Sequence, residues 1–421
     1  MRIVQVSTFT SGGAGIAAIR LNQALLENRV DSSVITLEKT SSDPTVKVIY
    51  YRETSIEPGT SSALSVAAES WRSIASNYPE RPWGLELFSN ADSAVNLTNI
   101  DEVQRADIVH LHWVAGLADY DEMASALKEK KIVWTLHDMN PFTGGCHYAD
   151  TCDRYMQSCG ACPQLGSTVE EDLSRRNWLK KYRSLQQLDI TVVTPSRWLA
   201  QCVVQSSILD NARVVTIPNG IPTHIFKPYN RDEVRESLQI PRDAKVILFG
   251  AESIANNRKG FVYLLEALKR YREPSGQKVI LVTFGLLDPT IALDSPYPLV
   301  QLGRIDDEAH LASIYSMADV TVIPSLEDNL PNVVLESMSS GTPVLGFNIG
   351  GIPDMIDHLS TGYVARARDV DDLMNGIQWM IDNVSFKMRV KCRDKVIKCF
   401  SYSACSQRMK ILYMSLSSSA V

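Results

Sequence analysis

Hydrophobic residues in this chain come in short runs that alternate with longer amphipathic stretches. The runs are four to six residues long and rich in Val and Ile, as in strands that are buried on both faces of a parallel sheet. The stretches between them place apolar residues three and four positions apart, which predicts helices. In the first half the predicted strands are 2–7, 33–37, 107–112, 132–136, 190–194 and 214–217. In the second half they are 245–250, 279–284, 299–302, 320–323 and 343–347. The pattern predicts an α/β protein with two doubly wound parallel-sheet, Rossmann-like domains.

A polar, proline-bearing stretch at 222–229 separates the two series and is interpreted as the linker. This interpretation gives an N-terminal domain over residues 1–222, a C-terminal domain over residues 223–400 and a terminal helix over residues 401–421. Residues 39–99 show little periodicity, and we expect them to form an excursion from the first domain.

The composition narrows the classes of function. The formal net charge of the chain is −6, whereas proteins that bind nucleic acid usually carry an excess of positive charge. No apolar run is long enough to span a membrane, and the N-terminal residues resemble a strand rather than a signal peptide. We therefore expect a cytoplasmic protein whose eight cysteines stay reduced.

The stretch 318–351 carries the most specific chemical pattern. It predicts a helix over about 331–340 between two buried strands, beginning at a proline and stopping at a glycine. The unpaired N–H groups at such a helix start favour a phosphate, whereas the carboxylates of Asp328 and Glu336 favour hydroxyl groups. A phosphate beside two sets of sugar hydroxyls describes a nucleotide-sugar.

The segment EDNLPNVVLE at 327–336 resembles the E-x7-E signature of family-4 retaining glycosyltransferases, in the subgroup that reads E-N-L-P-N-x-x-x-E. The resemblance implies the GT-B type of fold, with two Rossmann-like domains facing across a cleft. It places the nucleotide-sugar donor on the C-terminal domain and the acceptor on the N-terminal one, with the excursion at 39–99 on the acceptor side. It also returns the terminal helix to the N-terminal domain.

The same resemblance implies roles for the residues of this segment. Glu336 would hold the donor ribose, and Asp328 would hold the transferred sugar. The backbone that follows the sugar and the diphosphate would be that of Asn329, Leu330 and Pro331. Asp328 stands where the family has Glu and is one methylene shorter, which leaves the identity of the sugar open.

A glycine-rich loop after the first strand supports a competing interpretation. Residues Gly13 to Ala18 match the dinucleotide fingerprint G-x-G-x-x-A, and Glu38 follows 20 residues after Ala18. This spacing suits an NAD ribose contact, so an NAD-dependent oxidoreductase is one alternative. A tight turn with no ligand is another. The family resemblance instead implies that Gly12 and Gly13 let the donor diphosphate and the acceptor approach the backbone.

Arg258 and Lys259 precede the predicted helix 261–272. Positive charge at a helix start is unfavourable unless an anion binds there, so this pair predicts a diphosphate site. The resemblance implies a Lys and an Arg in this region. Lys259 matches the Lys, and Arg258 is taken as the substitute for the Arg because the loop is longer. The resemblance also implies that the backbone around Ile305 brackets the base.

The strand 132–136 ends in His137, at the edge of the sheet where open α/β proteins bind ligands. By resemblance, His137 would lie near the transferred sugar and the acceptor. No D-x-D element follows a strand, so we expect catalysis without a metal cofactor. Arg258, Lys259 and helix N-termini would stabilise the leaving diphosphate, which would itself accept the proton of the acceptor.

Four cysteines lie within 17 residues, namely Cys146, Cys152, Cys159 and Cys162. The last pair is a C-x2-C turn, and four thiolates can satisfy tetrahedral zinc, with His147 as a possible substitute ligand. We interpret the cluster as a structural clip for an acceptor loop that is similar to an insertion in this glycosyltransferase subgroup. Structural zinc, free thiols and an iron–sulfur cluster remain open.

The predicted helix 174–187 is basic and aromatic, and it suits either a solvated surface or contact with lipid headgroups or a lipid diphosphate. By resemblance the acceptor is a saccharide or lipid-linked saccharide of bacterial surface polysaccharide synthesis. That would place the protein at the inner face of the membrane, without nucleic acid as a partner. Besides the oxidoreductase, a sugar-nucleotide epimerase and a non-catalytic binding protein are the alternatives.

Overall fold

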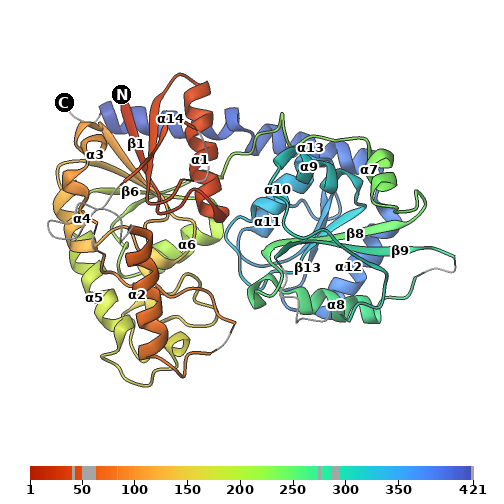
Figure 1. Cartoon of the computed structure of the whole chain (residues 1–421), viewed down its shortest axis with the longest axis horizontal. Coiled ribbons are helices and arrows are strands. Elements are labelled where there is room, and N and C mark those ends of the chain that lie inside the picture. The colour runs from red at the N-terminus through yellow and green to blue at the C-terminus, as the bar shows by residue number, and fades with distance from the viewer. Residues whose placement is uncertain are drawn as a thin grey trace. The chain divides into compact units, whose positions relative to one another are not determined.

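The computed structural model describes residues 1–39, 43–49, 63–82, 84–93, 95–273, 276–286 and 294–418. The chain forms two compact units (Figure 1). Unit 1 consists of Met1–Gly220 together with Cys405–Val421, and unit 2 consists of Ile221–Ala404.

Unit 1 is built on a seven-stranded parallel sheet with the order β3-β2-β1-β4-β5-β6-β7. The strand order changes direction between β1 and β4, which is the position where open α/β sheets bind ligands. The strands are β1 (Arg2–Val6), β2 (Asp31–Thr36), β3 (Val46–Val48), β4 (Ile108–Leu111), β5 (Lys131–Thr135), β6 (Ile190–Thr194) and β7 (Arg213–Thr216).

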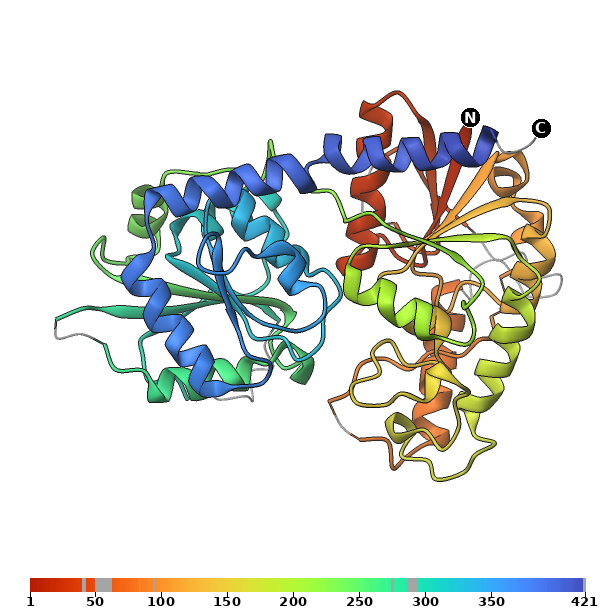
Figure 2. The ribbon, with the colours of Figure 1, turned by 180° about the vertical axis from the view of Figure 1, so that it is seen from behind.

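Helices cover both faces of this sheet, because successive strand residues point to opposite sides. Ile3 packs on one face with Leu25 of α1 and Tyr413 of α14, whereas Val4 packs on the other face with Met123 of α4. Figures 1 and 2 both show the blue helix α14 alongside β1. The helices are α1 (Gly12–Glu27), α2 (Ala63–Asn77), α3 (Asp101–Arg105), α4 (Tyr120–Leu127), α5 (Leu173–Leu185), α6 (Arg197–Gln205) and α14 (Tyr402–Ser418).

Unit 2 repeats this plan with a six-stranded parallel sheet of order β10-β9-β8-β11-β12-β13. The order changes direction between β8 and β11. Its strands are β8 (Lys245–Ser253), β9 (Val279–Leu286), β10 (Leu299–Gln301), β11 (Val320–Ile323), β12 (Val344–Phe347) and β13 (Gly362–Ala365). Its helices are α7 (Arg231–Ser237), α8 (Phe261–Arg270), α9 (Glu308–Met317), α10 (Asn332–Ser339), α11 (Ile352–Met355), α12 (Val370–Asn383) and α13 (Phe386–Phe400). The two parallel sheets confirm the predicted fold class.

The stretch 222–229, interpreted above as a linker, packs inside unit 2. Phe226 is fully buried in the core of that unit, and its carbonyl accepts hydrogen bonds from Ser339 and Arg393. The chain passes between the units at Gly220 and Ile221 and returns between Ala404 and Cys405. The linker interpretation was therefore wrong, because Phe226 is a core residue and Ile225 and Tyr229 pack against the same core.

Candidate functional site

In unit 2, Arg258 and Lys259 contact the carboxylate of Asp328 at the point where the strand order of the sheet reverses. Arg258 and Lys259 lie in a 3-10 helix, η5 (Asn257–Lys259), after β8, and Asp328 lies in the loop after β11. Lys259 Nζ donates to Asp328 Oδ2 at 2.7 Å, and Arg258 lies 3.3 Å from the same oxygen. Arg258 also donates to the Glu327 carbonyl at 2.7 Å. The structure thus brings the predicted pair Arg258 and Lys259 together with Asp328, which was predicted from a separate segment.

The charges in this cluster are shielded from water. Burial by itself raises the pKa of the Asp328 carboxyl, but Lys259 and Arg258 bring it below its ordinary value. Asp328 therefore stays ionised and balances the two cations. The helix α8 begins at Phe261, as predicted, and Gly260, with a φ of +69°, is its N-cap, so Arg258 and Lys259 lie directly before the helix start. Their charge is compensated internally, so it is not by itself a sign of a bound anion.

Close backbone contacts hold this loop cluster in place. A Cβ at Gly260 would lie 1.8 Å from the Pro324 carbonyl oxygen, and one at Gly350 would lie 1.7 Å from that of Asp328. Both glycines also have positive φ. Only glycine fits at either position, and the loops after β8, β11 and β12 are therefore packed against one another.

Glu336 lies on α10, whose first helical residue is Asn332 rather than Pro331. Its carboxylate is buried and accepts a hydrogen bond of 3.0 Å from the hydroxyl of Tyr315, which projects from α9. Pro331 is the N-cap of α10, and Gly341 has the left-handed φ of +82° expected of a helix stop. The sequence gave no signal for Tyr315, because its partner lies 21 residues away on another helix.

The other residues that were expected to bind the nucleotide-sugar donor lie along the same edge of the sheet. Asn329 and Leu330 are buried between Asp328 and the start of α10. Ile305 is partly buried and follows β10, beyond Gly303 with its φ of +67°. A Cβ at Gly303 would meet nothing within 4 Å, so open space borders the backbone before Ile305.

In unit 1 the glycine-rich segment, expected to be a loop, is largely helical, because α1 already begins at Gly12. Gly12 has a φ of +69°, and a Cβ at Gly15 would lie 2.7 Å from the Phe9 carbonyl oxygen. A Cβ at Gly13 would meet nothing within 4 Å. The chain itself thus needs glycine at positions 12 and 15 but leaves space above Gly13. Glu38 pairs with Phe9 in an isolated parallel bridge directly after β2.

His137 follows β5 at the carboxyl edge of the unit 1 sheet and lies at the end of a buried hydrogen-bond chain. Its Nε2 lies 3.0 Å from Nδ1 of His112, whose Nε2 lies 2.9 Å from Oε1 of Gln5. Gln5 uses its amide nitrogen to donate to Asn22 and Ser32. Its oxygen must therefore accept from His112, which then accepts from His137. This order places the unprotonated nitrogen of His137 at Nδ1.

Burial keeps these histidines neutral. It lowers the pKa of His137 to about 4, although Asp138 opposes the shift, and it lowers the pKa of His112 well below the ordinary value. A neutral His137 can accept or donate hydrogen bonds to sugar hydroxyls but carries no fixed charge. Gln5 and His112 escaped the sequence analysis because their roles depend on contacts between three strands.

His147 is not available as a metal ligand, because both of its ring nitrogens are engaged. Nδ1 lies 2.6 Å from Asp138 Oδ2, and Nε2 lies 2.8 Å from the Ser89 hydroxyl. The indole of Trp113 also donates to Asp138 at 2.8 Å. All three members of this Ser–His–Asp chain are buried. This hydrogen-bond network connects the cysteine-bearing loop to the end of β5 beside His137. Its serine, Ser89, is not exposed for nucleophilic chemistry.

The four clustered cysteines line one cavity together with Phe88, Arg154 and Tyr155. All are free thiols, and burial raises the pKa of Cys159 to about 12. Within the described ranges, no three His, Cys, Asp or Glu side chains are already gathered as metal ligands. Such thiols stay protonated near neutral pH and are poor nucleophiles.

The basic helix expected at 174–187 is α5, and most of its charge faces the protein. Lys181 is fully buried, and Lys180 forms ion pairs of 2.6 Å with Asp92 and Asp119. Only Arg176 and Arg183 among its cations are exposed. Of the two interpretations left open for this helix, contact with lipid thus has only these two exposed cations on α5 to support it. Across the described part of the chain, no helix combines the length and apolar character needed to cross a membrane.

Comparison with known proteins assigns both units. The model of Glycosyltransferase Family 4 matches residues 11–225, and that of Glycosyl transferases group 1 matches residues 230–398. An uncharacterized glycosyltransferase of Methanocaldococcus jannaschii is 26% identical over 69% of this chain and 78% of its own length. A putative colanic acid biosynthesis glycosyl transferase of Escherichia coli is 27% identical over 63% of this chain and 65% of its own.

Solved structures share the fold at low sequence identity. Sucrose-phosphate synthase of Thermosynechococcus elongatus aligns over all of both chains with a TM-score of 0.67 and 18% identity. Anabaena HepE in complex with UDP-glucose aligns over 99% of this chain and 100% of its own, with a TM-score of 0.62 and 14% identity. With two Rossmann-like units and a family model over its first half, the chain belongs to the family-4 glycosyltransferases of the GT-B fold.

Proposed function

We propose that this glycosyltransferase moves a sugar from a nucleoside-diphosphate sugar to an acceptor hydroxyl, with retention of anomeric configuration. The observation that supports this most is the Arg258–Lys259–Asp328 cluster at the reversal of strand order in unit 2. Two cations and the N-terminus of α10 suit a diphosphate. Asp328 and Glu336 supply carboxylates that suit sugar and ribose hydroxyls.

In this proposal the diphosphate competes with Asp328 for the two cations. Lys259 and Arg258 stabilise charge as the bond between the sugar and the phosphate breaks, and no metal ion is required for that step. Asp328 turns to hydroxyl groups of the transferred sugar, Glu336 binds the ribose, and the backbone of Asn329, Leu330 and Pro331 follows the diphosphate. The backbone around Ile305, where open space borders Gly303, brackets the base.

Unit 1 supplies the acceptor side. Gly13 leaves room for substrate beside α1, and Gly12 directs the backbone before it with a φ of +69°. His137 offers a neutral imidazole of fixed tautomer to a sugar hydroxyl. The leaving phosphate accepts the acceptor's proton. We propose a saccharide or lipid-linked saccharide acceptor at the inner face of a membrane. The Escherichia coli relative, named for colanic acid biosynthesis, supports a surface polysaccharide as the product.

The first experiment is thermal denaturation of the whole protein against a panel of sugar nucleotides, with NAD and NADP included. A ligand that binds the native state raises the midpoint by mass action. We expect one sugar nucleotide to stabilise the wild type and to lose that effect in Glu336→Ala. Stabilisation by NAD alone would refute the proposal. Release of an epimerised sugar nucleotide without any acceptor would instead establish the epimerase alternative.

A further inference from the structure

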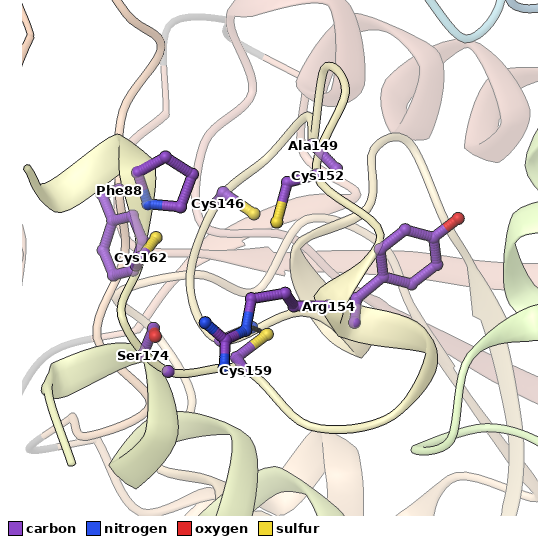
Figure 3. A pocket seen from close by; sticks show the side chains of 12 residues that line it. Phe88, Cys146, Ala149, Cys152, Arg154, Cys159, Cys162 and Ser174 are labelled. Atoms are coloured by element: carbon purple, nitrogen blue, oxygen red, sulfur yellow. Dashed lines mark hydrogen bonds between the residues drawn. The ribbon is translucent and has the colours of Figure 1, made fainter. Parts of the chain in front are cut away.

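Figure 3 shows the sulfur atoms of Cys146, Cys152, Cys159 and Cys162 around one small cavity of unit 1. The cavity has a volume of about 20 Å³, which suits a single water-sized occupant. The four thiols come from a segment with little regular structure, between β5 and α5, whose only elements are short 3-10 helices. Long irregular segments in compact domains usually need a cross-link or a ligand to fix them.

Near the cavity lies a buried cation that has no ion pair with any of the described carboxylates. Lys181 of α5 is fully buried, and its ammonium donates to the main-chain carbonyls of Asn140 at 2.6 Å and Thr143 at 3.1 Å. None of the described carboxylates forms an ion pair with it. Arg154 also lines the cavity, but its guanidinium is already paired with Glu170 at 2.7 Å. The ammonium of Lys181 also lies 5.1 Å from the centre of the Tyr120 ring. A buried ammonium that meets only carbonyl dipoles and an aromatic ring is costly, so an anionic group nearby would stabilise it.

Backbone geometry at the thiols also suits a metal. The Gly144 N–H donates to Cys159 Sγ at 3.2 Å, the kind of contact that stabilises a thiolate more than a thiol. The turn between Cys159 and Cys162 contains Gly160 at φ +147° and Ala161 at φ +42°. A Cβ at Gly160 would lie 2.4 Å from the Glu170 carbonyl oxygen, so the C-x2-C turn is fixed by its packing.

We propose that Cys146, Cys152, Cys159 and Cys162 bind one zinc ion as four thiolates, and that Lys181 balances the charge of this site. The sulfur atoms must turn further toward the cavity to reach liganding distance, because they are not yet gathered as a ligand set. Each thiol gives up its proton to solvent on binding. Zinc with four thiolates carries a net charge of −2, which the buried ammonium of Lys181 offsets in part. Redox chemistry is not involved.

The zinc site would fix the loop that carries His147. Cys146 and His147 are neighbours in the sequence. His147 is hydrogen-bonded to Asp138, which is the residue after His137. The metal would therefore be structural and would act on the candidate acceptor site only by positioning. This inference does not depend on the identity of the donor.

The test begins with zinc content per chain, measured by elemental analysis after expression with zinc. We expect about one zinc per chain in the wild type and a large loss in Cys152→Ser and Cys159→Ser. Cys392→Ser is the matched control, because Cys392 is a buried thiol of unit 2 that donates to the Thr361 carbonyl. Zinc retained in the two cluster variants, or absent from the wild type, would overturn the proposal.

A second measurement covers the case in which the cluster variants fold poorly. Wild-type protein stripped with a chelator should regain its thermal midpoint on adding zinc alone. Cobalt in place of zinc should give the thiolate charge-transfer and tetrahedral absorption bands of a four-sulfur site. Lys181→Met should weaken zinc binding without changing the stoichiometry at saturation. Iron with inorganic sulfide in the purified protein, or a midpoint that ignores both chelator and zinc, would contradict the assignment.

Discussion

Lys259 and Asp328 form a 2.7 Å ion pair between loops that follow two adjacent central strands, β8 and β11. Asp328, which was expected to bind the sugar, thus also neutralises Lys259 and Arg258, which were expected to bind the diphosphate. A diphosphate that binds here must therefore compete with Asp328 for these two cations.

Asp328→Asn tests this competition. The substitution leaves Lys259 and Arg258 without their carboxylate, and we expect a loss of about 1–3 kcal/mol in the free energy of unfolding. Inorganic pyrophosphate or a nucleoside diphosphate should then stabilise the variant more than the wild type, because it replaces the missing charge. Thermal denaturation with and without these ligands measures the difference. Equal shifts in both proteins would show that Asp328 and the ligand do not share the cations.

Lys259→Ala should leave a folded protein, because Arg258 still compensates Asp328. Loss of one positioned cation at a developing charge costs about 10²–10³ in kcat by analogy with other preorganised donors. Steady-state kinetics with saturating donor checks this. A Lys269→Ala variant, at an exposed ion pair on α8, is the control and should keep full activity.

Glu336→Gln keeps the volume of the side chain and can still accept a hydrogen bond from Tyr315. We expect little change in stability but a loss of most turnover, because an amide cannot accept two hydroxyl hydrogen bonds with full charge. Comparing kcat/KM for the wild type, Glu336→Gln and Tyr315→Phe separates the carboxylate's charge from its positioning. Full activity in Glu336→Gln would remove the carboxylate from the donor site.

Gly13→Ala and Gly15→Ala form a matched pair in the first turns of α1. Space is open above Gly13, so alanine there should keep or slightly raise stability, by about 0.4–1 kcal/mol. Alanine at Gly15 would clash with the Phe9 carbonyl and should destabilise the protein. If substrate passes close to this backbone, Gly13→Ala will lose activity while remaining stable. Unchanged kinetics in Gly13→Ala would place the substrate elsewhere.

Acid should destabilise the protein through its buried histidines. Burial, with a further contribution from His137, lowers the pKa of His110 to about 3, from an ordinary value near 6.5. The unfolded chain therefore binds the proton first, and the stability that neutral His110 contributes is lost as pH falls below about 6.5. The slope is at most about 1.4 kcal/mol per pH unit for each such group.

His110→Gln should show a shallower decline of the unfolding free energy between pH 6.5 and 4 than the wild type does. Chemical denaturation at a series of pH values measures both slopes. Parallel curves would mean that His110 is not held neutral by the fold.

Local sequence features predicted the fold better than they predicted the site's contacts. Strands such as β1 and β11 were recognisable because most of their residues are β-branched and apolar, although Gln5 and Thr321 are buried polar exceptions. Gly341 signalled the end of α10. The Asp328–Lys259 pair spans 69 residues, and the Tyr315–Glu336 and His112–Gln5 contacts also join separate elements. Such pairs depend on strand order, which no local periodicity encodes. Phe226 and the buried Lys181 were misjudged for the same reason, since their polar neighbours in sequence concealed their burial.

The helix α14 has a consequence for the order in which the chain can fold during synthesis. Met409, Leu412 and Tyr413 complete an apolar face of the unit 1 sheet, and Tyr413 lies 2.5 Å from Nδ1 of His110. A ribosome releases these residues only after all of unit 2 has been made. Unit 2 can therefore reach its native state first, while unit 1 waits with Ile3 and Leu25 uncovered. The N-terminal half of this enzyme is the last part to mature, and a truncation of the final 17 residues would expose its core.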